Sequence, residues 1–404
     1  MKSLTKFHPV ALGIIYGTFL ARAGFFMSLP FLGIYLHEVK GFNPVVTGAI
    51  LAVSFFVSTF ASFIGGAMSD RIGRYPIMIF SIFIWGGVFS GFAAAEEVWH
   101  FLILNALNGL CRSIFEPTAR AMLVDVTPQE TRVEVFNIRY FAINLGGAIG
   151  QIIGLFIGGA QTMIPFMISA GIYLVYGFLI FIWSRKYPIK VTREKEEKNT
   201  FGESLKIISK DRVFRFFLMG NIFVTGGYAH LDTTLSQYLG SDKASVYTIL
   251  FTTNALAILL LQFPIIKMMK RYSSLTALKA GCLLFSIGIL GFGISDSLVL
   301  FIVSMILFSV GEILCFIIGD VLISEIAPSN LRGAYFGAAG LQFIGQGAAA
   351  WFGGWLLNYF GVGSGAIVFG ILALFTIIAY PFFQYGQYLL GNKPSYFKTQ
   401  QNTN

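Results

Sequence analysis

The sequence predicts an all-α membrane protein with twelve transmembrane helices in two pseudo-symmetric six-helix halves. Hydrophobic residues make up 56% of the 404 residues and charged residues only 12%, about half the charged share of a soluble protein. A helix needs roughly 20 apolar residues to cross a bilayer, and the chain holds twelve runs near that length. They fall near 10–36, 44–68, 76–95, 99–123, 133–159, 163–184, 214–239, 245–268, 276–294, 298–322, 333–358 and 365–390.

The distribution of charge predicts how these helices are oriented. The formal net charge is +9, and nearly all the basic residues lie in one alternate set of loops, whereas Lys40 and Lys243 are the bases of the opposite set. Cytoplasmic loops are enriched in Lys and Arg, so we expect a multi-pass cell-membrane (plasma or inner membrane) protein with both termini in the cytoplasm. The lipid bilayer then accounts for the basic composition without nucleic acid, and we expect a monomer.

Composition also argues against several classes of function. The three cysteines all fall inside the predicted spans, where neither a disulfide framework nor a metal cluster is indicated. No nucleotide-binding loop and no nucleophile–base pair is visible in the sequence, and the first apolar run is too long for the core of a signal peptide. We therefore expect no enzyme, no cofactor and no bound metal.

A polar break divides the chain into two halves. It separates residues 1–184 from 213–404, with 185–212 as a cytoplasmic linker of mixed charge. The stretch 125–132, which begins with Asp and ends with Arg, recurs 200 residues later as 325–332, which runs from Glu to Arg. The match predicts that the two six-helix halves arose by duplication.

The stretch between the second and third apolar runs reads GGAMSDRIGRYP, residues 65–76, and is predicted to form a short loop. Glycines relieve crowding where helix ends approach, and charged side chains can bind a neighbouring helix end. The pattern G-x-x-[SA]-D-R-x-G-R is carried by Gly66, Asp70, Arg71, Gly73 and Arg74. It resembles the signature loop of the major facilitator superfamily of transporters, and the resemblance implies the major facilitator fold, with a substrate site between the halves near the midplane.

From this resemblance and the charges we expect a gate. Asp70 is predicted to contact the end of the eleventh span near Gly333, and Arg74 to pair with Asp125 at the end of the fourth. Gly146, Gly150, Gly154 and Gly158 recur every fourth residue of the fifth span, which predicts close packing against a partner helix. Exporters of the family often carry a related glycine stretch with a proline, where this chain has Gln151.

Charges inside the spans are the candidates for transport chemistry, because a charge at the bilayer centre costs roughly 2.5–3.5 kcal/mol on insertion scales. We consider eight such candidates, and if all are ionised those of the first half sum to +3 and those of the second half to −3. The residues are Arg22, Arg112, Glu116, Arg120 and Arg139, then Asp232, Glu312 and Asp320.

In the first half, Arg112, Glu116 and Arg120 are spaced by four residues and share one helix face. An internal salt-bridge ladder is one interpretation; the other is that Arg112 binds substrate. Arg22 has no acid within one turn of its own helix, so its partner must lie on another span or in the substrate. Arg139 is expected near the cytoplasmic end, where it can snorkel to the interface.

In the second half, Asp232 and Glu312 are the leading candidates for proton coupling and for binding substrate, with Glu116 and Asp320 as further proton-coupling candidates. A carboxylate removed from water favours its protonated form, which suits a proton carrier; the alternative is pairing with Arg22 or Arg112. Multidrug exporters of the drug:proton antiporter branch resemble this chain in placing acids in spans 7 and 10. His230 is expected to be a hydrogen-bonded packing residue.

These observations favour a proton-coupled secondary active transporter that exports small amphiphilic compounds or drugs by alternating access, with a small-molecule substrate and protons as its partners. One alternative is a carrier of a zwitterionic or anionic metabolite, peptide-like or an organic acid, whose acid end is bound by Arg22 and Arg112. Another is a lipid or glycolipid flippase of the same fold. The division of charge between the halves favours compounds that carry both a carboxylate and an amine.

Overall fold

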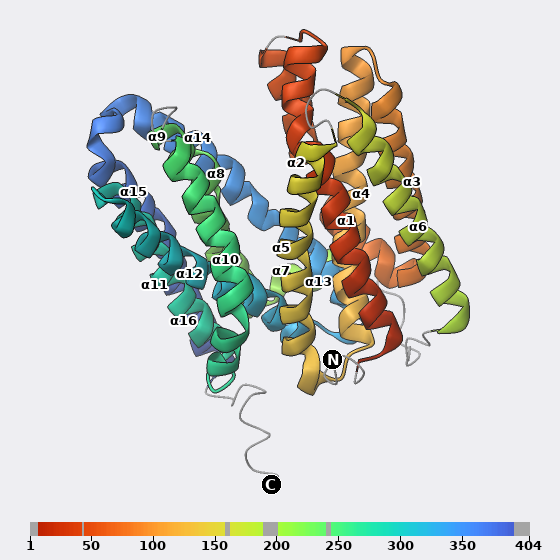
Figure 1. The fold of residues 1–404 in the computed structure, drawn as a ribbon. Coiled ribbons are helices and arrows are strands. Elements are labelled where there is room, and N and C mark those ends of the chain that lie inside the picture. Colours follow the sequence, from red (N-terminus) through yellow and green to blue (C-terminus); the bar gives the residue numbers. More distant parts are fainter. Residues whose placement is uncertain (1–6, 43, 158–161, 189–200, 240–243, 392–404) are drawn as a thin grey trace. The chain divides into compact units, whose positions relative to one another are not determined.

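The computed structural model describes residues 7–42, 44–157, 162–188, 201–239 and 244–391, and these are helical with no strand among them. Each predicted span contains helix (Figure 1). The first six are α1 (Pro9–Ile34), α2 (Pro44–Ile72), α3 (Arg74–Ala94), α4 (Val98–Asp125), α5 (Arg132–Phe156) and α6 (Ile164–Lys186). The short α7 (Phe201–Lys210) follows, a surface helix at the end of the predicted linker.

Three of the remaining spans are interrupted. The seventh is α8 (Arg212–Asp232) followed by α9 (Thr234–Leu239), and the next three are α10 (Ala244–Met269), α11 (Ser274–Ile294) and α12 (Leu298–Ile326). The eleventh is α13 (Arg332–Ala338) and α14 (Phe343–Phe360), joined by a 3-10 turn, and the twelfth is α15 (Gly365–Ile377) and α16 (Ala379–Leu390).

Among the described residues, eight helical segments are long and apolar enough to cross a bilayer. They correspond to α1, α2, α3, α6, α10, α11, α12 and the α15–α16 pair. Of the other four spans, those formed by α4, α5 and α8 carry charged side chains, and the α13–α14 span is broken. The prediction of an all-α membrane protein is confirmed.

The predicted loop at 65–76 is wrong in its extent. Helix α2 continues to Ile72 and α3 begins at Arg74, so Gly73 alone separates them, with a φ of 114° that favours glycine. The Gly73 N–H donates to the Ser69 carbonyl at 3.1 Å and closes the end of α2. Gly66, Asp70 and Arg71 are therefore helical residues, and their side chains have the fixed directions of a helix surface.

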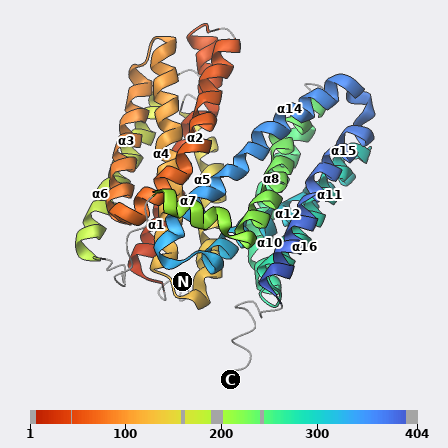
Figure 2. The same cartoon turned by 180° about the vertical axis from the view of Figure 1, so that it is seen from behind.

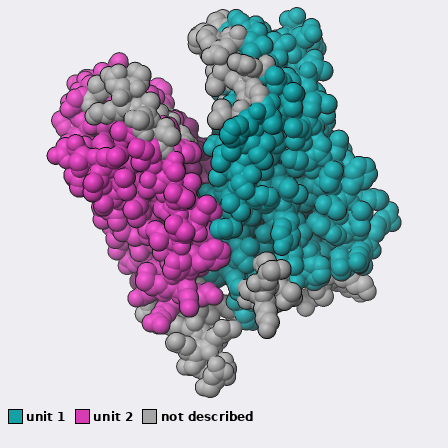
Figure 3. Space-filling model, in the orientation of Figure 1, with its two compact units in different colours: residues 1–205, 327–340 teal, residues 206–326, 341–404 magenta. Residues whose placement is uncertain are grey.

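The chain forms two compact units (Figure 3). Unit 1 consists of residues 1–205 and 327–340, and unit 2 of residues 206–326 and 341–404. Unit 1 therefore contains α13, which the sequence would place with the second half. The division at 185–212 stays a prediction, and residues 189–200 of that linker lie outside the described residues.

Within unit 1, α1 packs on α5 and α6, and α2 packs on α4 and α13. The predicted role of the α5 glycines is confirmed for three of them, and Gly158 lies outside the described residues. A Cβ on Gly146, Gly150 or Gly154 would collide with a carbonyl oxygen of α1, so these glycines let the two backbones meet. Tyr173 and Phe89 stack at 4.9 Å in the aromatic core of the unit.

Within unit 2, α11 packs on α12, α15 and α16, and α8 packs on α14 and α16 (Figure 2). The duplication is visible in the helix boundaries. Helices α3 and α11 begin at residues 74 and 274 and end at 94 and 294, and the 3-10 turns after α4 and α12 span 129–131 and 329–331. The spacing of 200 residues found in the sequence therefore relates structural elements as well.

Candidate functional site

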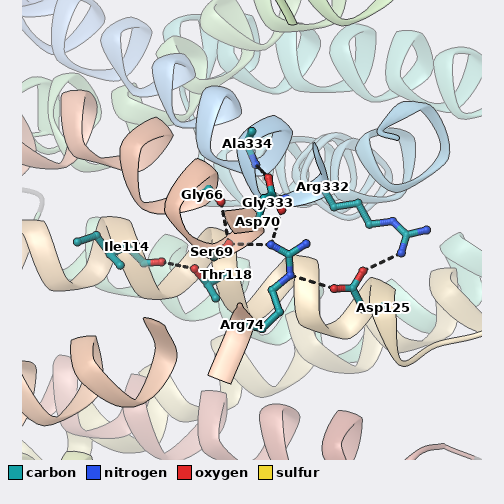
Figure 4. Close-up of polar contacts among 10 residues, drawn as sticks. All are labelled: Gly66, Ser69, Asp70, Arg74, Ile114, Thr118, Asp125, Arg332, Gly333 and Ala334. Atoms are coloured by element: carbon teal, nitrogen blue, oxygen red, sulfur yellow. Dashed lines mark hydrogen bonds and ion pairs between the residues drawn. The ribbon is translucent and has the colours of Figure 1, made fainter. Parts of the chain in front are cut away.

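The residues of the signature motif form a polar network at the ends of α2, α3 and α4, within unit 1 (Figure 4). We call Asp70, Arg74, Asp125 and Arg332 the helix-end network. Asp70 accepts hydrogen bonds from the first amides of α13: its Oδ1 from Gly333 N at 2.9 Å and its Oδ2 from Ala334 N at 2.7 Å. These amides have no partner within their own helix, so the Asp70 carboxylate both satisfies them and opposes their partial positive charge.

Arg74 links the two carboxylates of the network. Its guanidinium is 5% exposed and forms an ion pair with Asp70 through Nη1. Its Nε donates to Asp125 Oδ2 at 2.9 Å, and its Nη1 donates to Ser69 Oγ at 2.7 Å. Buried charges of this kind are tolerated because each is paired and hydrogen-bonded. The predicted contacts of Asp70 with the region of Gly333 and of Arg74 with Asp125 are both confirmed.

Arg332 completes the network at the start of α13. Its Nη1 donates to Asp125 Oδ1 at 2.7 Å, so Asp125 is held by two arginines. Sequence reasoning noticed Arg332 in the repeated stretch but did not assign it to the site. It also missed Ser69, although the motif restricts that position to Ser or Ala. Arg71 is exposed at the end of α2 and takes no part in the contacts described above.

Two glycines allow α2 and α13 to cross closely. A Cβ on Gly66 would collide with the Gly333 carbonyl oxygen, and a Cβ on Gly333 would come within 2.6 Å of Arg74 Nη1. The motif glycine at 66 is therefore required at a helix crossing rather than in a loop. This close approach is what brings the α13 amides within reach of Asp70.

A second cluster of charges lies inside the spans of unit 1. Glu116 of α4 accepts from Arg22 Nη2 of α1 at 2.7 Å through Oε1, and its Oε2 forms an ion pair with Arg139 Nη2 of α5. The ion pairs of Glu116 described here therefore run across helices, to α1 and α5, a pairing that the spacing along α4 does not predict. The close packing of α1 on α5 explains the difference, since it brings Arg22 and Arg139 to the same carboxylate.

The remaining arginines of unit 1 contact aromatic rings. The Arg112 guanidinium lies 5.8 Å from the Phe25 ring centroid and 5.5 Å from that of Phe55. The Arg120 guanidinium lies 5.2 Å from the Phe336 ring. Such cation–π contacts stabilise a cation without neutralising its charge. The expectation that Arg139 snorkels is wrong, because Arg139 is 5% exposed and held by Glu116.

Of the predicted acids of unit 2, Glu312 is the most completely buried that the structure describes. It is 2% exposed, and its Oε2 accepts from Asn254 Nδ2 of α10 at 2.8 Å. Asn254 also donates to Ser309 Oγ at 3.0 Å. The sequence analysis does not single out Asn254, although a polar residue in the middle of an apolar run is a signal of a buried contact.

The other residues singled out in unit 2 differ in how they are placed. Asp320 lies on α12, two helical turns beyond Glu312, and is partly buried. Asp232 is the last residue of α8, and its side chain lies outside the described residues. His230 is hydrogen-bonded as expected, with Nδ1 2.9 Å from Thr234 Oγ1.

Two pairs of charges within the spans have opposite signs at repeat-related positions. Arg112 and Glu312 are 200 residues apart on α4 and α12, and so are Arg120 and Asp320. The helix-end network has a reduced counterpart in unit 2, where Ser274 Oγ donates to Glu325 Oε2 at 2.9 Å. These two residues stand 200 positions after Arg74 and Asp125.

The chain is built from a duplicated set of membrane helices, with a charged network at helix ends and ionisable groups within the spans. These features together are typical of a membrane transporter. A family model of the Major Facilitator Superfamily matches residues 14–341 and 228–393. The chain belongs to this superfamily and is a transporter rather than an enzyme.

The sequences of several bacterial relatives align with most of this chain. An uncharacterized MFS-type transporter of Bacillus subtilis, YqjV, is 38% identical over 387 residues, which are 95% of this chain and 94% of that protein. A Na(+), Li(+), K(+)/H(+) antiporter of Planococcus maritimus is 28% identical, with 91% and 95% covered. The multidrug resistance protein MdtH of Klebsiella pneumoniae is 25% identical, with 85% and 86% covered.

Solved structures share the fold at low sequence identity. The fucose:proton symporter FucP, an Escherichia coli protein, in its outward conformation has a TM-score of 0.78 at 15% identity, with 94% of this chain and 98% of FucP covered. The similarity confirms the major facilitator fold predicted from the signature motif and the twelve spans.

Proposed function

We propose that this transporter is a proton-coupled antiporter that exports small amphiphilic compounds across the cell membrane by alternating access. The observation that carries the proposal is Glu312, a carboxylate 2% exposed in the middle of α12 that accepts a hydrogen bond from the neutral amide of Asn254. Relatives named as a cation/H(+) antiporter and as a multidrug resistance protein support the coupling and the substrate class. The basic loops support a cytoplasmic position for both termini.

Glu312 suits proton exchange because its hydrogen bond with the Asn254 amide is compatible with both of its protonation states. An amide N–H stabilises the carboxylate, but it does so much less than a guanidinium in the same position. Asp232 remains a second candidate of the same kind. Glu116, which is held by Arg22 and Arg139, is better suited to a structural role because two cations stabilise its charged form.

The helix-end network is proposed as the gate of the transport cycle. Its contacts join α13 to α2 and α4 through charged groups and two backbone amides. Such contacts stabilise one arrangement of the helices and are lost together when α13 separates from α2. Asp70, Arg74 and Asp125 are therefore gating residues, to which we add Arg332.

The proposal is tested with the purified protein in proteoliposomes that contain a pH-sensitive dye. Candidate substrates are added on one side: a lipophilic cation, an amphiphilic zwitterion, an amphiphilic anion, and the ions Na⁺ and K⁺. We expect an amphiphilic compound to drive proton movement in the opposite direction to its own. Proton movement with Na⁺ or K⁺ alone would support proton coupling but contradict the proposed class of substrate. No response to any compound would contradict both the coupling and the substrate class.

A second candidate function, transport of an anionic or zwitterionic metabolite, is favoured by Arg112. Its guanidinium contacts the rings of Phe25 and Phe55, and within the described residues its contacts include no carboxylate in ion-pair distance. Arg112→Gln is expected to reduce transport of the zwitterion and the anion by tenfold or more, on the order of one buried charge-assisted hydrogen bond, and to leave the cation unchanged. An equal loss for all three would make Arg112 a structural residue.

A further inference from the structure

A basic cavity lies beside the helix-end network, on the side of unit 1 where several helices end. Its volume is about 730 Å³, and its walls are the loop after α4, the start of α5, the end of α6 and the first residue of α13. The residues that carry charge are Asp125, Arg132, Lys186 and Arg332. Because Asp125 is already bound by Arg74 and Arg332, the cavity carries an excess of positive charge.

The walls of the cavity are fixed by contacts of their own. The Tyr187 carbonyl accepts a hydrogen bond from Tyr75 Oη of α3 at 3.1 Å. The Tyr187 ring contacts the His8 ring edge-on at 5.8 Å, while His8 caps α1 through its Nδ1 at 3.2 Å from Val10 N. The end of α6 is therefore held against α1 and α3, and Lys186 is presented at a defined place.

Among the described residues of the cavity, Thr127 and Arg332 each carry a buried polar atom without a hydrogen-bond partner, Thr127 Oγ1 and Arg332 Nε. Leaving such groups unsatisfied costs free energy. Both can donate a hydrogen bond, so each would be satisfied by an acceptor in the cavity. An anion is the acceptor that also matches the excess of positive charge.

We infer that this cavity binds the phosphate group of a ligand, through Lys186, Arg332 and the Thr127 hydroxyl. Guanidinium and ammonium groups bind phosphate with charge-assisted hydrogen bonds, and basic cavities at the cytoplasmic ends of membrane helices are suited to anionic lipid headgroups. With the orientation proposed above, the cavity opens at the inner leaflet, where such headgroups are present. A soluble phosphate compound offers the same chemistry.

Binding would also act on the gate. Arg332 uses Nη1 to hold Asp125, whereas the atom without a partner is Nε. A phosphate oxygen at Nε therefore adds a contact to Arg332 without replacing the one to Asp125. The bound anion stabilises the helix-end network in the arrangement described here, and it links the composition of the membrane to the closing of the gate.

The experiment compares two neighbouring basic residues of α6. Lys186 lines the cavity, whereas Arg185 does not; both are exposed, and each guanidinium or ammonium group lies over an aromatic ring of its own segment. The full chain is placed in nanodiscs of phosphatidylcholine with increasing phosphatidylglycerol, and lipid binding is measured by native mass spectrometry together with the melting temperature. A parallel series in detergent replaces the lipid with inorganic phosphate.

We expect phosphatidylglycerol to bind and to raise the melting temperature. Lys186→Gln should weaken binding about fivefold, the effect of about 1 kcal/mol for one basic residue at a membrane surface, and Thr127→Val should weaken it too, whereas Arg185→Gln should not. Equal binding of inorganic phosphate, with the same dependence on Lys186, would assign the site to a soluble phosphate compound. Equal weakening by Lys186→Gln and Arg185→Gln, or no binding of either probe, would overturn the inference. None of these readouts requires transport, so they are independent of the proposed function.

Discussion

The two units hold their acidic residues in different ways. In unit 1, Glu116 is bound by Arg22 and Arg139, and Asp125 by Arg74 and Arg332. In unit 2, Glu312 accepts from the amide of Asn254, and Glu325 accepts from the hydroxyl of Ser274. Two regions related by duplication thus differ in the contacts described here: guanidinium groups bind the carboxylates of unit 1, and an amide and a hydroxyl donate to those of unit 2.

This difference indicates that the carboxylates of the two units have different roles. A carboxylate between two guanidinium groups favours its ionised form, because protonation would leave those cations without a counter-charge. A carboxylate bound by an amide or a hydroxyl loses much less when it gains a proton. In the proposed function, unit 1 therefore supplies ion pairs that position helices, and unit 2 supplies Glu312, the carboxylate proposed to exchange protons.

The largest effect is expected from breaking the ion pairs of Glu116. Glu116→Gln leaves Arg22 and Arg139 in the spans without their carboxylate, and removing one partner of a buried ion pair costs about 3–5 kcal/mol. We expect a large decrease in melting temperature and little protein in the membrane. Glu96→Gln, which removes an exposed acid at the end of α3, serves as the control. A Glu116→Gln protein as stable as the control would contradict the account of unit 1.

Asp70→Asn tests the gate and is expected to have the next largest effect. The amide can accept one hydrogen bond from the start of α13, but it loses the charge that opposes Arg74 and the α13 amides. Transport in proteoliposomes should fall tenfold or more while the amount of protein in the membrane is kept. Wild-type transport by this variant would show that the motif only connects α2 and α3.

Ser274→Ala is expected to have a small effect, since it removes a single hydrogen bond to Glu325. A charged acceptor makes such a bond worth about 1.5–3 kcal/mol at most, and partial exposure lowers that value. We expect a decrease in melting temperature well below that of Glu116→Gln, with transport within about twofold of wild type. A loss of transport as large as that of Asp70→Asn would mean that the two units use equally strong helix-end contacts.

Much of this architecture follows from the sequence alone. The apolar runs predict all twelve spans, and the repeat of 200 residues predicts that Asp125 and Glu325 occupy matching helix ends. The contact of Arg74 with Asp125 is expected from the resemblance of the signature motif to that of the superfamily, together with the opposite charges of two residues at helix ends. These features depend on local composition and spacing, which a sequence displays directly.

The partners of the intramembrane charges were harder to predict. The spacing of four residues suggested that Glu116 pairs along α4, but the partner is chosen by how α1, α4 and α5 pack. The glycines at 146, 150 and 154 predict close packing against another helix, but only the structure shows that this helix is α1. In the same way, Asn254 becomes a site residue only because α10 lies against α12, a relationship between residues 58 positions apart.

The most direct test of the proposed proton coupling is whether the Glu312→Gln variant still transports in response to a pH gradient. The variant keeps the size of the side chain and its contact with Asn254 but cannot exchange a proton. In proteoliposomes loaded with an exported compound, we expect it to retain exchange of labelled for unlabelled compound and to lose transport driven by a pH gradient. The matched control is Asp296→Asn, an exposed acid of unit 2, which should behave as wild type. Transport by Glu312→Gln that still follows the pH gradient would contradict the assignment of the proton to Glu312.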